Sequence, residues 1–425
     1  MAFGDNQNDT YTETETVSYG SRISGSFKGM LPGVLMFLAA FPILFWNEGR
    51  AVKTARALDE GQDVVIEVES NKEVDPQYDG RLVHMAGFAN TKEILQDATF
   101  GITGTWIRLE REVEIYQWVE DSETVEKKNL GGSVTKTTTY SYSLKWCNGR
   151  VDSSSFKKSG HDNPPGDMEF ESEKWQAEEV SFGAFRLSPW QIDHIGDDRA
   201  YVLPESFTSR VDRVQVAGGV IYVPERATRA NPKNVRNVAS ETRPGDMRVR
   251  YRVVRPHNVS IVAKQRGDSF VPFTSKKGKG YQVNLLADGI ADSNEMFETA
   301  RTGNAILTWF LRIVGFFLMF RGLKKFLAPI STLGDVLPLL GDLLEVGVGL
   351  VAGVIAFACA LLTCAVAWIF YRPVLGVTLI VVAGAGIWFL WQKRAALKSK
   401  AGAALDKAKE LKQKIEEAEK KGTKA

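Results

Sequence analysis

The chain has 425 residues, of which 44% are hydrophobic and 24% are charged, and its formal net charge is +2. So small a net charge excludes the global basic field with which a nucleic-acid-binding protein attracts its partner. Three cysteines in a chain of this length exclude a disulfide-rich scaffold, and two of them, Cys359 and Cys364, lie within one apolar run.

The first predicted membrane helix covers residues 29–46, which carry no charge and end on the aromatic pair Phe45-Trp46. A helix that crosses a bilayer needs about 20 consecutive apolar residues, and aromatic side chains are typical of its interfacial ends. Residues 1–28 are polar and lack hydrophobic periodicity, so we expect a disordered cytoplasmic N-terminus. Because this polar stretch comes first, we expect the helix to be retained and not cleaved as a signal peptide.

Residues 47–303 are predicted to form one large, strand-rich domain outside the membrane. In residues 107–119, apolar side chains alternate with charged ones, which is the period-two pattern of a half-buried strand. Residues 134–146 alternate in the same way after a turn-rich segment, so the two stretches predict a long antiparallel hairpin. A further strand is predicted at residues 247–253. Helix is expected at residues 51–60, which continue the first membrane helix out of the bilayer, and again only near residues 288–302.

The C-terminal part of the chain is predicted to contain three further membrane helices. The predicted segments are membrane helices at 304–320, 346–371 and 374–391, a basic loop and amphipathic helix at 321–345, and a basic cytoplasmic helical tail at 392–425. Pro373 marks the turn between the last two membrane helices, since proline cannot continue a helix. The fold class is therefore an α+β multi-pass membrane protein with four transmembrane helices, one N-terminal and three C-terminal, and the large domain inserted between the first and the second.

The lysines and arginines predict the orientation in the membrane. Residues 393–425 hold eleven basic and five acidic residues, and Arg321, Lys324 and Lys325 follow the second predicted membrane helix. Cytoplasmic flanks of membrane helices are enriched in Lys and Arg, so we expect both segments on the cytoplasmic side. Four crossings then place the N-terminus in the cytoplasm and the large domain on the other side, although the basic residues at 50–56 favour the reverse.

The sequence contains no arrangement of residues typical of a catalytic or metal site. Its four histidines, His84, His161, His194 and His257, are far apart, and no His-Glu-x-x-His, Cys-x-x-Cys or Gly-rich phosphate-binding motif occurs. We therefore expect no catalytic residues, no cofactor and no metal, and we expect that the protein is not an enzyme.

Arg312 is the most unusual residue, because it lies near the centre of a predicted membrane helix, where a guanidinium group costs free energy on insertion. One hypothesis is that it pairs with an acid and lines a seam of the bundle or a pore. The candidate partners, whose spacing places them on one stripe of an amphipathic helix, are Asp335, Asp342 and Glu345. The alternative is that Arg312 snorkels or faces a neighbouring helix, and that the three acids face water.

Two further sets of residues predict contacts of the helices. Glycines four residues apart favour close helix packing, at Gly29 and Gly33 and again at Gly349 and Gly353. The basic residues expected to contact anionic lipid headgroups are Arg321, Lys324, Lys325, Lys393 and Arg394. The tail also has apolar residues at roughly heptad spacing, so the alternative is that it adds to an oligomer.

Several short motifs resemble those of the transmembrane protein 43 family, also called LUMA. They occur in the family's order from the first predicted membrane helix to the last. The motifs are Asn47-Glu48-Gly49-Arg50-Ala51, Gly80-Arg81-Leu82-Val83-His84, Tyr116-Gln117-Trp118-Val119-Glu120, Tyr140-Ser141-Tyr142, Gln265-Arg266-Gly267-Asp268, Val271-Pro272-Phe273 and Phe370-Tyr371-Arg372-Pro373.

The resemblance implies the same order of one span, a large domain and three spans, and it implies no established enzymatic activity. Animal members of the family are described at the endoplasmic reticulum and inner nuclear membrane, where they self-associate and organise membrane complexes. The chain departs from the family in its short N-terminal tail, in the lack of a recognisable eukaryotic sorting signal and in its charged C-terminal helix. Bacteria also carry relatives, and we expect such a relative in the cytoplasmic membrane, with its domain in the periplasm. In a eukaryote the domain would be lumenal.

We therefore expect a non-enzymatic, self-associating membrane scaffold that organises protein or lipid complexes. Its expected partners are the lipid bilayer, with anionic lipids, and further copies of the chain, but not nucleic acid. The alternative is an ion channel or transporter formed by the C-terminal helix bundle, which the intramembrane Arg312 favours.

Overall fold

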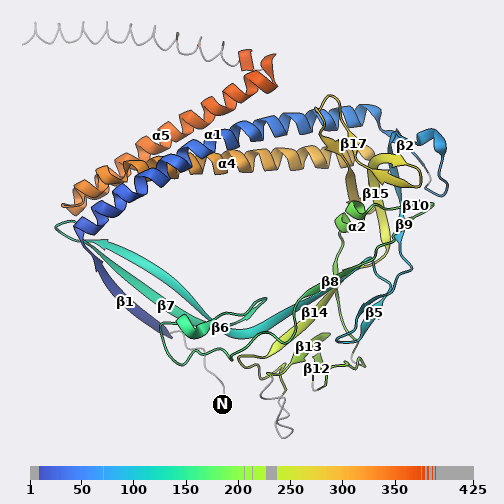
Figure 1. Cartoon of the computed structure of the whole chain (residues 1–425), viewed down its shortest axis with the longest axis horizontal. Coiled ribbons are helices and arrows are strands. Elements are labelled where there is room, and N and C mark those ends of the chain that lie inside the picture. The colour runs from blue at the N-terminus through green and yellow to red at the C-terminus, as the bar shows by residue number, and fades with distance from the viewer. Residues whose placement is uncertain are drawn as a thin grey trace, which may run out of the picture.

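The computed structural model describes most of the chain, and its helices and strands meet at both ends of the molecule (Figure 1). The residues that it describes are 9–378 except 70, 205, 213, 226–236 and 375, together with 381, 385 and 388. Three long helices lie on one side, and the strands form the other side (Figure 1). The outline is a closed loop, because a long hairpin reaches back from the strand-rich domain to the far end of the helices.

The first long helix, α1 (Tyr19–Val64), contains the predicted membrane helix but is much longer. It begins after Ser18, whose hydroxyl accepts a hydrogen bond from the backbone N–H of Ser21. Its 46 residues extend about 69 Å at the helical rise, roughly twice the thickness of a bilayer's hydrocarbon core. Polar turns of α1 therefore extend beyond the apolar segment at both ends.

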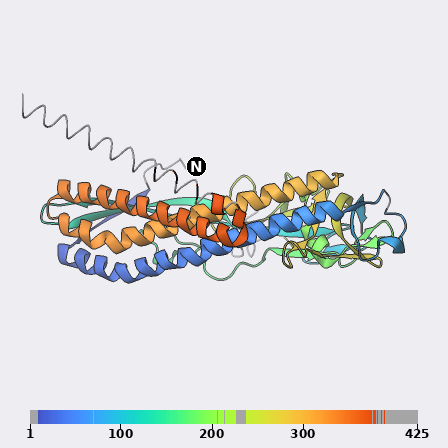
Figure 2. The ribbon, with the colours of Figure 1, turned by 90° about the horizontal axis from the view of Figure 1, so that it is seen from above.

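The helices α4 (Ser293–Gly334) and α5 (Pro338–Tyr371) lie beside α1 (Figure 2). The basic loop predicted after residue 320 is helical instead, since no proline occurs between residue 320 and Pro329 and α4 accommodates that proline within its last turns. The amphipathic helix predicted within residues 321–345 is interrupted, because α4 ends at Gly334 and Pro338 begins α5.

By length and composition, three helices in the described part of the chain can cross a membrane, namely α1, α4 and α5. This finding agrees with a membrane protein that carries a strand-rich domain between its first and second apolar helices. The fourth predicted helix at 374–391 lies largely outside the described residues, and the tail at 392–425 lies wholly outside them. The number of four membrane helices therefore stays a prediction.

Glycines allow the backbones of α1 and α4 to approach closely. A Cβ atom added at Gly33 would lie 2.8 Å from the carbonyl oxygen of Gly322, and one added at Gly322 would lie 2.7 Å from the carbonyl oxygen of Gly33. Gly49 has the same role toward α5, since a Cβ atom there would lie 2.5 Å from the ring of Tyr371. Small residues at such crossings replace side-chain contacts by direct backbone packing.

The larger sheet has eight strands in the order β1-β7-β6-β14-β13-β12, with β11 pairing with β14 and β8 with β6. The strands are β1 (Thr10–Val17), β6 (Arg108–Lys128), β7 (Val134–Cys147), β8 (Glu173–Gln176), β11 (Arg199–Tyr201), β12 (Gln215–Ala217), β13 (Val220–Val223) and β14 (Met247–Val254). The predicted long hairpin is confirmed as β6 and β7, whose register pairs Ile115 with Cys147 and Lys128 with Val134. The predicted strand at 247–253 is confirmed as β14.

The disorder predicted for residues 1–28 is wrong for the described part of that segment. β1 pairs with β7 along its whole length, and α1 begins two residues after β1 ends. The segment alternates threonine with glutamate, and threonine is favoured in strands because of its β-branch. The strand could not be predicted from the sequence because its hydrophobicity is low: β1 is stabilised by backbone pairing with a distant segment and not by a buried face.

The second sheet has seven strands in the order β19-β15-β16-β10-β9-β3-β2, with β15 also pairing with β3. The strands are β2 (Ile66–Glu67), β3 (Leu82–Asn90), β9 (Ser181–Phe182), β10 (Phe185–Arg186), β15 (His257–Arg266), β16 (Ser269–Val271) and β19 (Leu285–Asp288). The remaining elements are the pairs β4 (Leu95–Asp97) with β5 (Ile102–Gly104) and β17 (Phe273–Thr274) with β18 (Gln282–Val283), the short helix α2 (Pro189–His194), and the 3-10 turns η1 (Pro76–Tyr78) and η2 (Ser153–Ser155).

A buried apolar cluster joins the domain to the helices. Its residues are Ala57 and Leu58 of α1, Met296 and Phe297 of α4, and Leu82, Val262 and Val283 of the domain. Burial of each larger side chain stabilises this joint by about 1.5–3 kcal/mol. Because the cluster lies on unbroken helices, α1 and α4 enter the domain as rigid elements and not through a flexible linker.

Candidate functional site

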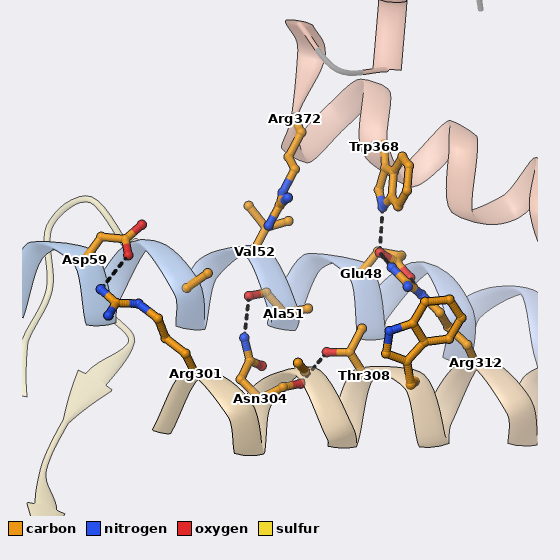
Figure 3. Close-up of a pocket in the computed structure, with 13 residues that line it drawn as sticks. Glu48, Ala51, Val52, Asp59, Arg301, Asn304, Thr308, Arg312, Trp368 and Arg372 are labelled. Atoms are coloured by element: carbon orange, nitrogen blue, oxygen red, sulfur yellow. Dashed lines mark hydrogen bonds and ion pairs between the residues drawn. The ribbon is translucent and has the colours of Figure 1, made fainter. Parts of the chain in front are cut away.

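A charged pair joins α1 to α4 near the ends of their apolar segments, and its surroundings form the candidate functional site (Figure 3). The Nε atom of Arg312 lies 2.6 Å from Glu48 Oε1, and its Nη2 atom lies 2.8 Å from Glu48 Oε2. The indole Nε1 of Trp368 on α5 donates a third hydrogen bond to Glu48 Oε2 at 2.6 Å. One carboxylate therefore connects all three helices.

Because this ion pair is largely buried, each of its charges would cost free energy without the other. The side chain of Glu48 is 1% exposed and that of Arg312 is 21% exposed. A buried charge is tolerated when it is paired, and removal of one partner from such a pair costs about 3–5 kcal/mol. The guanidinium of Arg312 also lies 4.7 Å from the ring centre of Trp309 and 5.7 Å from that of Trp368, which adds cation–π attraction.

The partner of Arg312 differs from those proposed from the sequence. The three acids proposed for this role were Asp335, Asp342 and Glu345. They lie at the opposite end of the helices, where they surround Lys128 of the hairpin at 3.0, 2.9 and 3.0 Å. The physical reason is that α1 and α4 are antiparallel neighbours, so the acid that follows the first apolar segment meets Arg312, whereas the three proposed acids belong to the junction of α4 and α5.

We call this distant contact the hairpin latch and define it by Arg22, Lys128, Asp335, Asp342 and Glu345. Arg22 of α1 pairs with the buried Asp335, and its Nη1 atom donates to the carbonyl oxygen of Gly132 in the hairpin turn at 2.6 Å. Burial alone would lower the pKa of Lys128, but the three carboxylates raise that pKa above its ordinary value. The latch therefore holds the tip of the β6–β7 hairpin against the end of the helices by charge.

Glu48 is the residue of the site that the sequence analysis missed. It belongs to a motif that directly follows the first apolar segment, and from its position alone it is interpreted as a charge at the membrane interface. Its depth in the membrane could have identified it, because an acid at the end of one apolar helix lies at the same depth as a base inside the antiparallel neighbouring helix. This signal requires knowing which helices are neighbours, and the sequence does not provide that.

Further polar contacts extend the junction toward the domain. Arg50 donates to Asn304 Oδ1 and to Thr308 Oγ1, both at 2.9 Å. About one helical turn closer to the domain along α4, Arg301 forms an ion pair with Asp59 of α1 at 3.0 Å. The seam between α1 and α4 thus changes from apolar packing to hydrogen bonding as it approaches the domain.

A pocket of about 310 Å³ opens beside this junction, between the three helices (Figure 3). Its lining consists of Glu48, Ala51, Val52, Ala55 and Asp59 of α1, Arg301, Asn304, Ala305, Thr308, Trp309 and Arg312 of α4, and Trp368 and Arg372 at the end of α5. Charged, aromatic and small apolar side chains thus meet in one concave surface. Such a mixed lining fits a ligand that has both a polar and an apolar part.

The other predicted site residues are dispersed. Gly33 lies at the crossing of α1 and α4, while nothing lies within 4 Å of a Cβ atom added at Gly29 or Gly349, and one at Gly353 would lie 3.7 Å from the ring of Phe320. Three basic residues expected at headgroups are exposed on α4, namely Arg321, Lys324 and Lys325. Lys393 and Arg394 lie outside the described residues.

The geometry of the junction favours a structural role over a chemical one. The two oxygens of Glu48 accept hydrogen bonds from three donors, so this carboxylate is committed to holding helices together. Within the part of the chain that the structure describes, no three His, Cys, Asp or Glu side chains gather as a metal site would require.

The family model and the similar proteins all point to one protein family. The family model described as Transmembrane protein 43 matches residues 115–373. Transmembrane protein 43 of Mus musculus is 36% identical over 363 residues, which cover 83% of this chain and 86% of that protein, and the Homo sapiens protein is 35% identical over the same shares. The Transmembrane protein 43 homolog of Drosophila melanogaster is 31% identical over 369 residues, which cover 84% of this chain and 93% of that protein. No solved structure matches the chain.

Proposed function

Since the chain belongs to the transmembrane protein 43 family, a family of membrane proteins, we propose that it is a non-enzymatic, self-associating integral membrane scaffold. In this proposal the apolar helices anchor the protein and associate with other copies. The strand-rich domain is then held at a fixed position relative to the membrane, where it organises protein or lipid complexes.

The observation that carries this proposal is the continuity of α1 and α4 from the apolar segment into the core of the domain. Phe297 of α4 is fully buried in the joint, and Leu58 of α1 packs in the same cluster. The ion pair of Glu48 and Arg312 fixes the two helices to each other before they reach the joint. A scaffold requires such rigidity, because it has to transmit its position in the membrane to the partners it holds.

Little of the apolar surface of the helices is covered within one chain: 17% of the most apolar 18-residue segment of α1 is buried, and 22% of the corresponding segments of α4 and α5. In a bilayer this surface contacts lipid or a second copy of the chain. Along α5 a row of large apolar residues is exposed: Leu350, Val354, Phe357 and Leu361. Gly349 directly precedes this row, is half-buried, and has nothing within 4 Å of its added Cβ atom, so the backbone of another helix could approach there.

The channel or transporter remains the alternative, but it has lost its main support. Arg312 favoured it as an unexplained charge within an apolar helix, and that charge is now accounted for by Glu48. The three acids that could have lined a pore with it surround Lys128 instead. A conductance measurement in planar bilayers tests this alternative, and the scaffold proposal predicts no current above background.

Co-purification of two differently tagged copies of the full chain tests self-association. We expect the tags to co-purify from a mild detergent, and we expect Gly349→Leu to reduce the recovered partner because its side chain occupies the space of an approaching helix. Gly303→Leu is the matched control, since this glycine also lies in a helix with nothing within 4 Å of its added Cβ atom but near the domain. Failure of the wild-type copies to co-purify would contradict the proposal.

A further inference from the structure

We propose that the pocket beside the Glu48–Arg312 pair binds the phosphate-bearing headgroup of an anionic phospholipid, with Arg372 as its principal contact. This inference needs only the membrane placement of α1, α4 and α5, and it does not depend on self-association. It also differs from the headgroup contacts predicted from the sequence, of which Arg321, Lys324 and Lys325 lie toward the opposite end of α4 and Lys393 and Arg394 lie outside the described residues.

The pocket lies where all three helices change from apolar to polar residues. The apolar segment of α1 ends at Trp46, that of α4 begins after Asn304, and α5 ends at Tyr371. Tryptophan and tyrosine are typical of the interfacial region of a bilayer, and this region contains the lipid phosphates. The opening of the pocket is therefore at the depth of the headgroups.

Among the charged residues that line the pocket, one arginine has no acidic partner within the described part of the chain. Glu48 is paired with Arg312 and Asp59 with Arg301, so both acids in the lining are already neutralised. Arg372 extends from the end of α5 toward Val52 of α1 (Figure 3). Among the described residues, none forms a hydrogen bond or ion pair with its guanidinium group.

The neighbouring turns of α1 add more positive charge that no acid balances. Arg50 contacts only neutral side chains, Arg56 donates to the carbonyl oxygen of Tyr371 at 2.5 Å, and Lys53 lies over aromatic rings. Within the described residues, none of these three has a carboxylate oxygen within the 4.0 Å limit of a salt bridge. Arg50, Lys53, Arg56 and Arg372 thus place four positive charges, without acidic partners in the region that the structure describes, on neighbouring turns beside the pocket, and such a cluster attracts an anionic headgroup.

The rest of the lining explains why this anion would be a lipid and not free phosphate. Ala51, Val52 and Ala55 of α1 face Ala305 and Trp309 of α4 across the pocket. Free phosphate has no group that gains from contact with these apolar side chains, whereas the glycerol and upper acyl carbons of a phospholipid do. Arginine is also well suited to phosphate, because its planar guanidinium can donate two parallel hydrogen bonds.

Native mass spectrometry of the full chain in mixed micelles tests the proposal. The probes are phosphatidylglycerol, phosphatidylcholine as a neutral lipid, and inorganic phosphate without lipid. We expect retained phosphatidylglycerol, and we expect Arg372→Gln to weaken its binding by about tenfold, as loss of one charge-assisted hydrogen bond does. Arg255→Gln is the matched control, since Arg255 is exposed in the domain and this change removes the same charge.

The possible results separate the sources of the anion. Loss of phosphatidylglycerol in Arg372→Gln alone, with phosphatidylcholine unaffected, supports the proposal. Equal binding of phosphatidylglycerol by wild type and Arg372→Gln overturns it. Inorganic phosphate that binds as tightly as the lipid, and in the same Arg372-dependent manner, overturns the assignment to a lipid.

A second variant covers the case in which Arg372→Gln fails to fold. Ala305→Trp fills the pocket from α4 without changing any charge, and Ala305 is an exposed residue of the lining. We expect this variant to exclude phosphatidylglycerol while its thermal unfolding in detergent stays close to that of the wild type. Undiminished binding of phosphatidylglycerol to a folded Ala305→Trp variant overturns the proposed location.

Discussion

The ammonium group of Lys128 lies 3.0 Å from a carboxylate oxygen of Glu345, although β6, to which Lys128 belongs, starts in the domain at the other end of the helices. The apolar segment of α1 thus lies between this latch and the domain. The hairpin is rich in Thr, Ser, Glu and Lys and cannot pass through hydrocarbon. These helices therefore cannot cross the bilayer upright while the latch is closed.

We predict that the latch opens when the protein is inserted in a bilayer. Entry of five partly exposed residues of α4 alone gains about 4–8 kcal/mol, whereas partly exposed ion pairs such as those of Lys128 contribute about 1 kcal/mol each. The five residues are Ile306, Phe310, Ile313, Val314 and Phe317. Spin labels at Leu130 in the hairpin turn and Leu333 near the end of α4 report the distance, which we expect to be long in nanodiscs. A short distance there would mean that the helices lie along the membrane surface.

Glu48→Gln is predicted to destabilise the protein by about 3–5 kcal/mol, because it leaves the charge of Arg312 without its partner in a buried site. The double change of Glu48→Gln with Arg312→Gln should recover part of this loss, since it removes both charges. Thermal or denaturant unfolding in detergent measures both effects. Glu126→Gln is the control, because Glu126 forms an exposed pair with Lys136 and should contribute less than about 1 kcal/mol. Equal effects of the Glu48 and Glu126 changes would contradict the structural role of the junction.

The apolar segments and the long hairpin could be predicted from the sequence because their patterns are local. Uncharged stretches of membrane length and strict period-two alternation identify α1 and β6–β7 without reference to the rest of the chain. The strand β1 could not be found in this way, since its alternating Thr and Glu residues gain order only by pairing with β7. The helical conformation of the segment that contains Arg321, Lys324 and Lys325 could not be predicted either, because positive charge indicates exposure and not backbone conformation.

The candidate site was predicted only in part for the same reason. Arg312 is conspicuous because it interrupts a local apolar pattern, and the expectation that it needs an acid follows from elementary electrostatics. The identity of that acid depends on the packing of α1 against α4, which a close approach of Gly33 and Gly322 determines. Contacts between segments far apart in the chain have no local signature, so Glu48 and the hairpin latch could be recognised only in the folded protein.

Gly33→Leu is predicted to separate α1 from α4 and to destabilise the bundle. Its added side chain would meet the backbone of Gly322, which cannot move aside as a flexible side chain could, and overpacking of this kind typically costs about 1–3 kcal/mol or more. Gly29→Leu is the matched control one turn earlier, where nothing lies within 4 Å of an added Cβ atom. Unfolding in detergent compares the two variants. The same stability for both would show that the backbones do not approach at Gly33.

The N-terminal strand is predicted to detach at acid pH. Hydrogen bonds from Lys158 and His161 lower the pKa of Asp9 below its ordinary value of 3.8. The folded pKa is therefore below the unfolded one, so the stabilisation is present at neutral pH and is lost as pH falls through the folded pKa. The protection of the β1 amides from hydrogen exchange, measured relative to the intrinsic rate at each pH, should fall below about pH 4, the unfolded pKa of aspartate.

Asp9→Asn supplies the control for this pH effect. It should lower the protection of the β1 amides already at neutral pH and should remove the further loss of protection in acid. Exchange in the distant strand pair β3–β15 should stay unchanged in the variant. Rapid exchange of β1 in the wild type at neutral pH would contradict the pairing with β7.

Light scattering of the full chain in nanodiscs tests the central claim, self-association in the membrane, most directly. The mass of the protein component, after subtraction of lipid and belt protein, gives the number of copies in each disc. The account predicts a defined multiple of the chain mass that falls in Gly349→Leu and is unchanged in Gly303→Leu. A single chain per disc, in discs large enough for several copies and across the accessible protein concentrations, would contradict it.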